Sequence, residues 1–254
     1  MSSVAASRHI ASSPFRNAKR VADGSLVLRF RLSETVRGKI VRSATVAPAR
    51  PVKPGWHQRP TTMLVVPKAV GRVQAESGLE ADAYRAFALD QTIHSFQVQP
   101  FRIEYDDNGR VISTYPDVEL HHADGSYEIV QIKSFATYQK HLETNPRFRA
   151  EEKILKHFGW NYRVLTENEI RAQPNHSNIR LLWHYKTRLV ADDLRDAIAA
   201  TVRKHKSMKV SDLVNATSSK RVHEADIYAL VSQGFLKTDQ TQLIGPGAFV
   251  IATA

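Results

Sequence analysis

Hydrophobic and polar positions divide the 254-residue chain into three parts. In the central part, residues 61–187, apolar residues at helical spacing alternate with runs in which every second residue is apolar. A first helix is predicted to begin at Ser77, and antiparallel strands are predicted at residues 101–105, 111–120 and 126–134. A helix at 147–158, a strand at 161–165 and a helix from Glu167 follow. This order predicts a mixed α/β core.

The two flanking parts have different patterns. Residues 1–60 contain one strand-like run, 26–32, and then a stretch broken by four prolines, 48–60. Proline lacks an N–H and restricts φ, so this stretch is predicted to be an extended linker. Residues 188–254 contain helical patterns at 192–204, 210–216 and 219–233, with short strands predicted at 235–237 and 242–244. Three helices followed by a hairpin are typical of a winged-helix domain.

The formal net charge of +11 is concentrated in residues 1–60, which hold 12 basic and two acidic residues. The rest of the chain is nearly balanced, with 24 basic and 23 acidic residues. Such asymmetry indicates a polyanion or an acidic protein surface as partner. We therefore expect a basic N-terminal arm whose contacts with phosphate depend strongly on salt. Arg16, Lys19 and Arg20 are its candidate nucleic-acid-binding residues.

Composition excludes several classes of protein. The hydrophobic fraction of 42% suffices for a sizeable core and excludes wholesale disorder. No apolar run approaches the roughly 18 residues of a membrane-spanning helix. Without cysteine, disulfides, thiolate nucleophiles and cysteine-based zinc sites are absent, and a cytosolic setting is favoured. The first 22 residues lack acids, as in a transit peptide, but the basic character continues well beyond them.

The candidate chemistry lies on the second and third predicted strands. Side chains alternate along a strand, so Asp117 and Lys133 share a face only if the intervening hairpin loop has an odd number of residues. A two-residue loop would turn Asp117 to the other face. A three-residue loop at 123–125, with Gly125 in the left-handed region, puts Asp117 opposite Gln131 and diagonal to Lys133. We therefore predict the three-residue loop.

These motifs resemble a known nuclease pattern. Pro116-Asp117 followed by Gln131-Ile132-Lys133, behind a helix carrying Glu80, resembles the PD-(D/E)xK nucleases. More narrowly, residues 61–187 resemble the TnsA-type transposon endonucleases, which have glutamine where the general pattern has an acid. The further motifs that carry this resemblance are Ser77-x-x-Glu80, Gln99-Pro100, Gly159-Trp160, the strand at 162–165 and the acidic helix at 166–170.

The resemblance implies a restriction-endonuclease-like mixed sheet flanked by helices, followed by a winged-helix domain. It implies an endonuclease that depends on Mg²⁺, with Mn²⁺ as a substitute, and cuts the 5′, non-transferred strands at transposon ends. The implied partners are double-stranded DNA, a TnsB-like DDE transposase and a TnsC-like AAA+ ATPase. The implied location is the bacterial cytoplasm, with nucleoid association during activity.

The resemblance also assigns roles to four residues. Asp117 is expected to ligate Mg²⁺, with Glu80 as a second carboxylate and Gln131, or a neighbouring backbone carbonyl, completing the shell without added charge. Carboxylate-bound hard cations provide hydroxide near neutral pH and neutralise charge on the transition state. Lys133 is expected to orient the attacking water or to stabilise charge on the phosphate.

Each of these residues also has an ordinary structural interpretation. Ser77 and Glu80 form a capping-box pattern, in which Glu80 merely accepts a backbone N–H. Asp117 alone is compatible with a strand residue beside a turn, and Lys133 with an edge-strand charge that discourages aggregation. Three nearby side chains are also of types that bind metals. Glu119 lies on the face of Asp117 and is the rival ligand. His121 and His122 lie near the turn, where we expect them to be solvated.

Alternatives remain open for the C-terminal part and for the function. The winged-helix domain either docks the ATPase, which we favour because nine basic and seven acidic residues nearly balance, or binds DNA through Lys220 and Arg221. The basic arm has a competing use on an acidic surface of the transposase. The whole chain is alternatively a restriction or repair nuclease of the same superfamily, or a winged-helix DNA-binding regulator with an inactive core.

Overall fold

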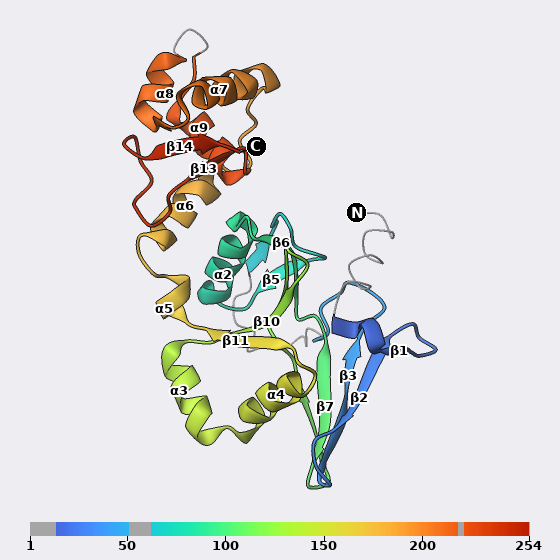
Figure 1. Ribbon diagram of the computed structural model, residues 1–254. Coiled ribbons are helices and arrows are strands. Elements are labelled where there is room, and N and C mark those ends of the chain that lie inside the picture. The colour runs from blue at the N-terminus through green and yellow to red at the C-terminus, as the bar shows by residue number, and fades with distance from the viewer. Residues whose placement is uncertain (1–13, 51–61, 218–220, 254) are drawn as a thin grey trace. The chain divides into compact units, whose positions relative to one another are not determined.

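The computed structural model describes residues 14–50, 62–217 and 221–253, and the chain divides into two compact units (Figure 1). The first unit is Met1–Ile170 and the second is Arg171–Ala254. Helix α6 (Asn175–Tyr185) belongs to the second unit, where it packs against α9 (Glu224–Ser232). The domain boundary therefore precedes α6, whereas the sequence pattern put it at residue 187.

The first unit contains a five-stranded antiparallel sheet in the order β1-β2-β3-β7-β8. Its strands are β1 (Lys19–Arg20), β2 (Leu26–Arg31), β3 (Val36–Arg42), β7 (Arg102–Asp107) and β8 (Arg110–Thr114). The predicted strand-like run is confirmed as β2. The expected N-terminal arm is wrong for residues 19–42, because β3 pairs along its length with β7. Most of the predicted linker, residues 51–61, lies outside the described residues.

A glycine in β3 allows this strand to fit between β2 and β7. Gly38 pairs with Phe30 on one side and Tyr105 on the other. A Cβ at Gly38 would lie 2.2 Å from the carbonyl oxygen of Glu104 and 2.7 Å from the Phe30 ring. This close approach of the neighbouring strands requires glycine at position 38. Because glycine is unfavourable inside strands, the sequence pattern did not predict β3.

A second sheet has the order β11-β10-β9-β6, with β10 and β11 parallel and the other pairs antiparallel. Its strands are β6 (Ile93–Val98), β9 (Val118–His122), β10 (Tyr127–Ile132) and β11 (Asn161–Leu165). The helices of this unit are α2 (Gly78–Leu89), α3 (Phe135–Thr144), α4 (Pro146–His157) and α5 (Glu167–Ile170), with a 3-10 turn η1 at Pro14–Asn17. A small pair, β4 (Thr62–Leu64) and β5 (Val73–Ala75), completes the unit. Strands and helices alternate as expected for a mixed α/β, nuclease-like fold.

The strand predicted at 111–120 is wrong, because it is two strands in two different sheets. β8 ends at Thr114 in the five-stranded sheet, and β9 begins at Val118 in the four-stranded sheet. Pro116 separates them, since proline has no N–H for a ladder and keeps the preceding residue extended. The chain therefore crosses from one sheet to the other directly before Asp117.

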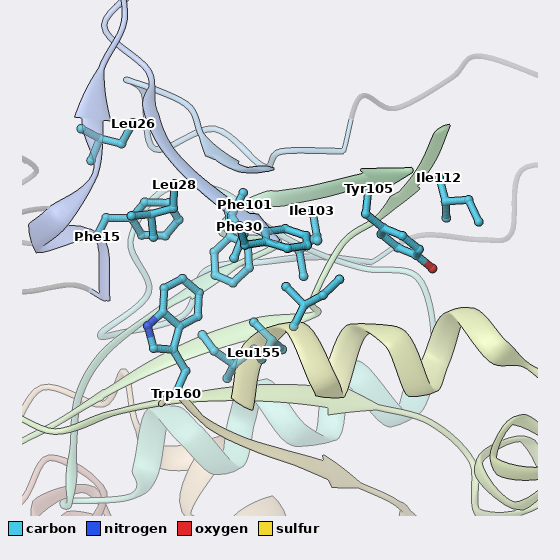
Figure 2. Packing of buried hydrophobic residues seen from close by; sticks show 13 residues of the cluster. Phe15, Leu26, Leu28, Phe30, Phe101, Ile103, Tyr105, Ile112, Leu155 and Trp160 are labelled. Carbon is cyan, nitrogen blue, oxygen red and sulfur yellow. The ribbon is translucent and has the colours of Figure 1, made fainter. Parts of the chain in front are cut away.

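A buried hydrophobic cluster fills the space between the five-stranded sheet and α4 (Figure 2). Leu28 and Phe30 of β2 and Ile103 of β7 point into it, together with Ile154 and Leu155 of α4. Three aromatic rings close the cluster: Phe15, Phe101 and Trp160 lie with ring centroids 5.5 to 5.6 Å apart. One face of the sheet is thus buried, and its other face is left to solvent.

A buried group of charges joins the two sheets. Arg42, at the end of β3, forms an ion pair with Glu119 of β9, and both side chains are almost wholly buried. The Arg42 guanidinium also lies 4.7 Å from the centroid of the Phe15 ring. His121 donates from Nε2 to Glu119 Oε1 over 2.6 Å. Burial, with Arg42 nearby, lowers the pKa of His121 to about 4, so the ring is neutral at pH 7.

In its described residues, 171–217 and 221–253, the second unit contains α6, three further helices and a three-stranded antiparallel sheet. These are α7 (Asp192–His205), α8 (Val210–Ala216), α9 and the sheet β12-β14-β13, with strands Met208–Lys209, Phe249–Ala252 and Leu236–Thr238. The strand predicted at 242–244 is wrong. Ile244 there donates its N–H to Asn178 Oδ1 of α6, and the second hairpin strand is β14. Within the described ranges, no helix has the length and hydropathy needed to cross a membrane.

Candidate active site

The hairpin between β9 and β10 has the predicted register. Its pairs run from His121 opposite Tyr127 to Val118 opposite Val130, so Asp117 and Gln131 follow as the next opposed positions. The loop is the predicted 123–125, in which Gly125 has φ +85° and donates to the carbonyl of His122 over 3.1 Å. The left-handed glycine lets three residues close the hairpin.

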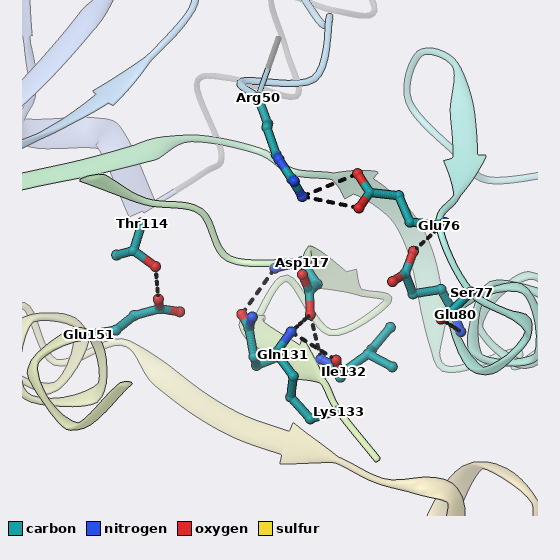
Figure 3. A network of polar contacts seen from close by, with 10 residues as sticks. All are labelled: Arg50, Glu76, Ser77, Glu80, Thr114, Asp117, Gln131, Ile132, Lys133 and Glu151. Atoms are coloured by element: carbon teal, nitrogen blue, oxygen red, sulfur yellow. Dashed lines mark hydrogen bonds and ion pairs between the residues drawn. The ribbon is translucent and has the colours of Figure 1, made fainter. Parts of the chain in front are cut away.

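This register brings the Asp117 carboxylate to Gln131 and Lys133 (Figure 3). Lys133 Nζ lies 3.0 Å from Asp117 Oδ2 and also donates to the carbonyl of Ile132. The N–H of Ile132 donates to the same carboxylate oxygen over 2.7 Å, and Gln131 Oε1 accepts the N–H of Asp117 over 3.2 Å. Asp117 and Lys133 are only 17% and 26% exposed, which strengthens their attraction.

The backbone of Asp117 is held by the predicted Gln-Pro motif. Gln99 donates its N–H to the carbonyl of Asp117 over 2.8 Å and adopts a positive φ of 45°. The carbonyl of Gln99 in turn accepts the N–H of Ala49. The segment before β7 thus positions the residue that enters β9.

Glu80 lies on the other side of Asp117, in the first turn of α2 (Figure 3). It forms only half of the capping box that the sequence left open, because its carboxylate binds the N–H before the N-cap residue Ser77 and not that of Ser77 itself. Ser77 Oγ accepts the N–H of Glu80 over 3.1 Å, while Glu80 Oε2 accepts the N–H of Glu76 over 2.7 Å. Burial raises the pKa of Glu80, and the charge of Asp117 raises it further. Glu80 therefore accepts a backbone N–H ahead of the helix, and its carboxylate still lies close enough to Asp117 for the two charges to influence each other.

Asp117 has two opposing influences on its ionisation. Burial raises the pKa of Asp117 above its ordinary value, while Lys133 and the Ile132 N–H favour the charged form. A largely buried carboxylate that is hard to keep charged gains most from a cation. The protein supplies one such cation, Lys133, at hydrogen-bonding distance.

A residue that the sequence did not reveal lies beside this group. Glu151 of α4 is 3% exposed, and its Oε2 accepts a short hydrogen bond from Thr114 Oγ1 at the end of β8. Burial raises the pKa of Glu151 to about 7, against the hydrogen bond from Thr114, which lowers this pKa; the charge of Asp117 raises it and that of Lys133 lowers it by smaller amounts. The sequence did contain one signal for this residue. Glu151 lies at a core position of α4, a helix that also buries Ile154 and Leu155.

The remaining candidates lie elsewhere. Glu119 is buried in an ion pair with Arg42 and a hydrogen bond with His121, so it is not a rival ligand beside Asp117. His121 is buried, not solvated as expected. Arg16, Lys19, Arg20 and Arg221 are exposed, and Lys220 lies outside the described residues.

The donor set of this site fits a hard divalent cation. Asp117 and Glu80 offer carboxylate oxygens, and Gln131 offers an amide oxygen. The described residues contain no group of three or more acidic, histidine or cysteine side chains arranged for a metal. Mg²⁺ accepts such a sparse set, because it keeps several waters and is commonly held by one or two carboxylates.

One family model matches part of this chain. Residues 90–167 match the family model described as TnsA-like endonuclease N terminal. The matched range includes Asp117, Gln131, Lys133 and Glu151, while Glu80 precedes it. No curated protein matches the chain. The match supports a TnsA-type nuclease domain, which implies a DNA substrate and a role in transposition.

Proposed function

We propose that this chain is a metal-dependent DNA endonuclease of a heteromeric transposase, which cuts the 5′, non-transferred strands at transposon ends. One observation carries the proposal: Asp117, Gln131 and Lys133 meet at the end of the β9–β10 hairpin, within the range that matches the TnsA-like model. Their residue types and order are those of the resembling nucleases.

Each residue has a distinct part in the proposed reaction. Asp117, Glu80 and Gln131 would hold Mg²⁺, and the chemistry that the ion would supply is activation of water and neutralisation of charge on phosphate. Lys133, fixed by Asp117 and by the carbonyl of Ile132, presents its ammonium group to the developing negative charge. Because this group is prepositioned, little reorganisation is needed during the reaction.

The second unit is proposed to be a winged-helix domain that docks the AAA+ ATPase. Its helices α7, α8 and α9 with a three-stranded antiparallel sheet support the first part of this proposal. Large exposed apolar side chains at Phe235, Phe249 and Ile251 support a protein partner. A DDE transposase that processes the 3′ ends is the other proposed partner, and the bacterial cytoplasm the proposed location.

The decisive variant is Asp117→Ala. With Mg²⁺, the partner proteins and an end-containing duplex, 5′-strand cleavage should fall at least about 100-fold, since losing a direct ligand exceeds the usual effect of losing an outer-shell partner. Binding to DNA and to partners should persist. Glu143→Ala, an exposed acid of α3, is the matched control and should cleave normally. Normal 5′ cleavage by Asp117→Ala would refute the proposal.

Two further measurements separate the alternatives. A restriction or repair nuclease would cut DNA without a transposase, whereas the proposed enzyme should be inert alone. An inactive regulator would show no difference in Mn²⁺ binding between the wild-type chain and Asp117→Ala, as measured by titration calorimetry.

A further inference from the structure

The face of the five-stranded sheet that points away from α4 carries a cluster of basic side chains. In β2, Leu28 and Phe30 are buried, so the alternating Arg29 and Arg31 lie on the exposed face. In β3 their partners are Lys39 and Arg37. We call Arg29, Arg31, Arg37 and Lys39 the basic sheet face.

Like charges stand directly opposite each other on this face. Arg29 is opposite Lys39 and Arg31 is opposite Arg37, an arrangement that destabilises an antiparallel pair. Lys39 is relieved by Glu104, 2.9 Å away. Within the described part of the chain, Arg29, Arg31 and Arg37 form no ion pair with a carboxylate. Arg31 donates to the carbonyl of Ser33, and Arg37 lies opposite Asp106 of β7, so the fold compensates the charges of these three arginines only in part.

The exposed face of the sheet as a whole has a net positive charge. Its charged strand positions are Lys19, Arg29, Arg31, Arg37, Lys39 and Arg102 against Glu104 and Asp106. Adjacent strands are about 4.8 Å apart, and residues two apart in a strand are about 7 Å apart. Duplex DNA carries a negative charge about every 1.7 Å along its axis, so several phosphates fall within such a patch.

The pairing connects this face to the candidate active site. One row across the sheet contains Arg29, Lys39, Glu104 and Ser113. Ser113 of β8 precedes Asp117 by four residues, at most about 13 Å of extended chain. Lys39 is two strand spacings, roughly 10 Å, from Ser113. These separations are short enough for one duplex to reach both places.

We propose that the basic sheet face binds the phosphate backbone of the duplex beside the cut. The proposal rests on the proposed nuclease function, because that function makes DNA the polyanion available. Phosphate contacts then come from a folded sheet, which holds the duplex in a fixed position relative to Asp117.

Substitution tests this proposal better than deletion, because deleting residues 1–60 would remove three strands of the sheet. The variant is Arg29→Gln/Arg31→Gln/Arg37→Gln. The matched control, Lys140→Gln/Lys153→Gln/Lys156→Gln, removes the same charge from exposed positions of α3 and α4. Binding of each to a fluorescent duplex is measured by anisotropy in EDTA over a range of salt concentrations, and folding is checked by circular dichroism.

Three lost phosphate contacts should reduce the slope of log affinity against log salt by about 2 to 3. The control should keep the wild-type slope. An unchanged slope in the arginine variant, an equal reduction in the control, or no DNA binding by the wild-type chain at low salt would overturn the proposal. Cleavage is assayed separately with Mg²⁺ and partners. If the arginine variant has a reduced slope but the wild-type chain does not cleave DNA, only the proposed nuclease function is refuted. If the wild-type chain cleaves DNA but the slope of the arginine variant is unchanged, only the proposed role of the basic sheet face is refuted.

Discussion

At the scale of single residues, Glu151 combines burial with an ionisable group. Its carboxyl has one short hydrogen bond, from Thr114, and lies near the charges of Asp117 and Lys133. Burial disfavours its charged form, so near neutral pH the group is poised between protonated and ionised. The proton on Glu151 is therefore linked to the stability of the fold.

We predict that Glu151→Gln removes part of the pH dependence of stability. Between the ordinary pKa of 4.5 and the folded value of about 7, the folded chain holds a proton that the unfolded chain has lost. The free energy of unfolding therefore falls as pH rises through this range, by about 3 kcal/mol at full effect. Glutamine, which does not ionise, should flatten this decline in urea titrations without divalent cations.

The matched control for this prediction is Glu152→Gln, the next residue of α4. Glu152 is partly exposed and pairs with Lys156 over 2.7 Å. It should retain the pH dependence of the wild-type chain. An identical pH profile for Glu151→Gln and the wild type would contradict the prediction.

At the scale of elements, the two sheets of the first unit are joined through charge as well as apolar packing. Arg42 ends β3 and Glu119 lies within β9, and each is almost fully buried. Removing one member of such a pair leaves the other charge buried without compensation. The position of β9, and with it that of Asp117 directly before the strand, thus depends on an ion pair with a residue that is distant in the sequence.

We predict that Glu119→Ala lowers the free energy of unfolding by about 3 to 5 kcal/mol. Glu104→Ala is the matched control, because Glu104 also faces Lys39 and Arg102 but lies on the exposed face. It should cost less than about 1 kcal/mol. If guanidinium titrations show equal decreases in the free energy of unfolding for the two variants, the buried ion pair matters no more to stability than the exposed one, and the prediction is wrong.

At the scale of the whole molecule, the contacts separate residues 1–170 from 171–254. We predict that fragments ending and beginning at this boundary each unfold cooperatively, as followed by circular dichroism. A fragment 1–187 should aggregate more than the fragment 1–170. It carries α6 without α9 and therefore exposes Ile179 and Leu182, which the second unit buries. Equal behaviour of the 1–170 and 1–187 fragments would contradict the boundary.

Much of this architecture was accessible from local patterns. Helices α2, α4, α7 and α8 and strands β2, β10 and β11 were predicted to within a few residues, because each shows its own periodicity. The register of Asp117 with Gln131 followed from counting loop residues and from Gly125. The nuclease motifs and the residues proposed to carry the reaction were visible for the same local reason.

Long-range pairing decided the rest. Composition predicted a charged N-terminal arm, but β3 pairs with β7 across about 60 to 70 residues of sequence, and part of the charge of this arm lies on a sheet face. Glu119 looked like a ligand because it lies two residues from Asp117, but Arg42 of the distant strand β3 pairs with it in the core. Glu151 looked like any acid of a helix. By itself the sequence determined the elements, the hairpin register and the residue types of the site, because these depend on neighbouring residues. Only the tertiary structure decided which face each charge occupies, because burial and strand pairing join residues that are distant in the chain.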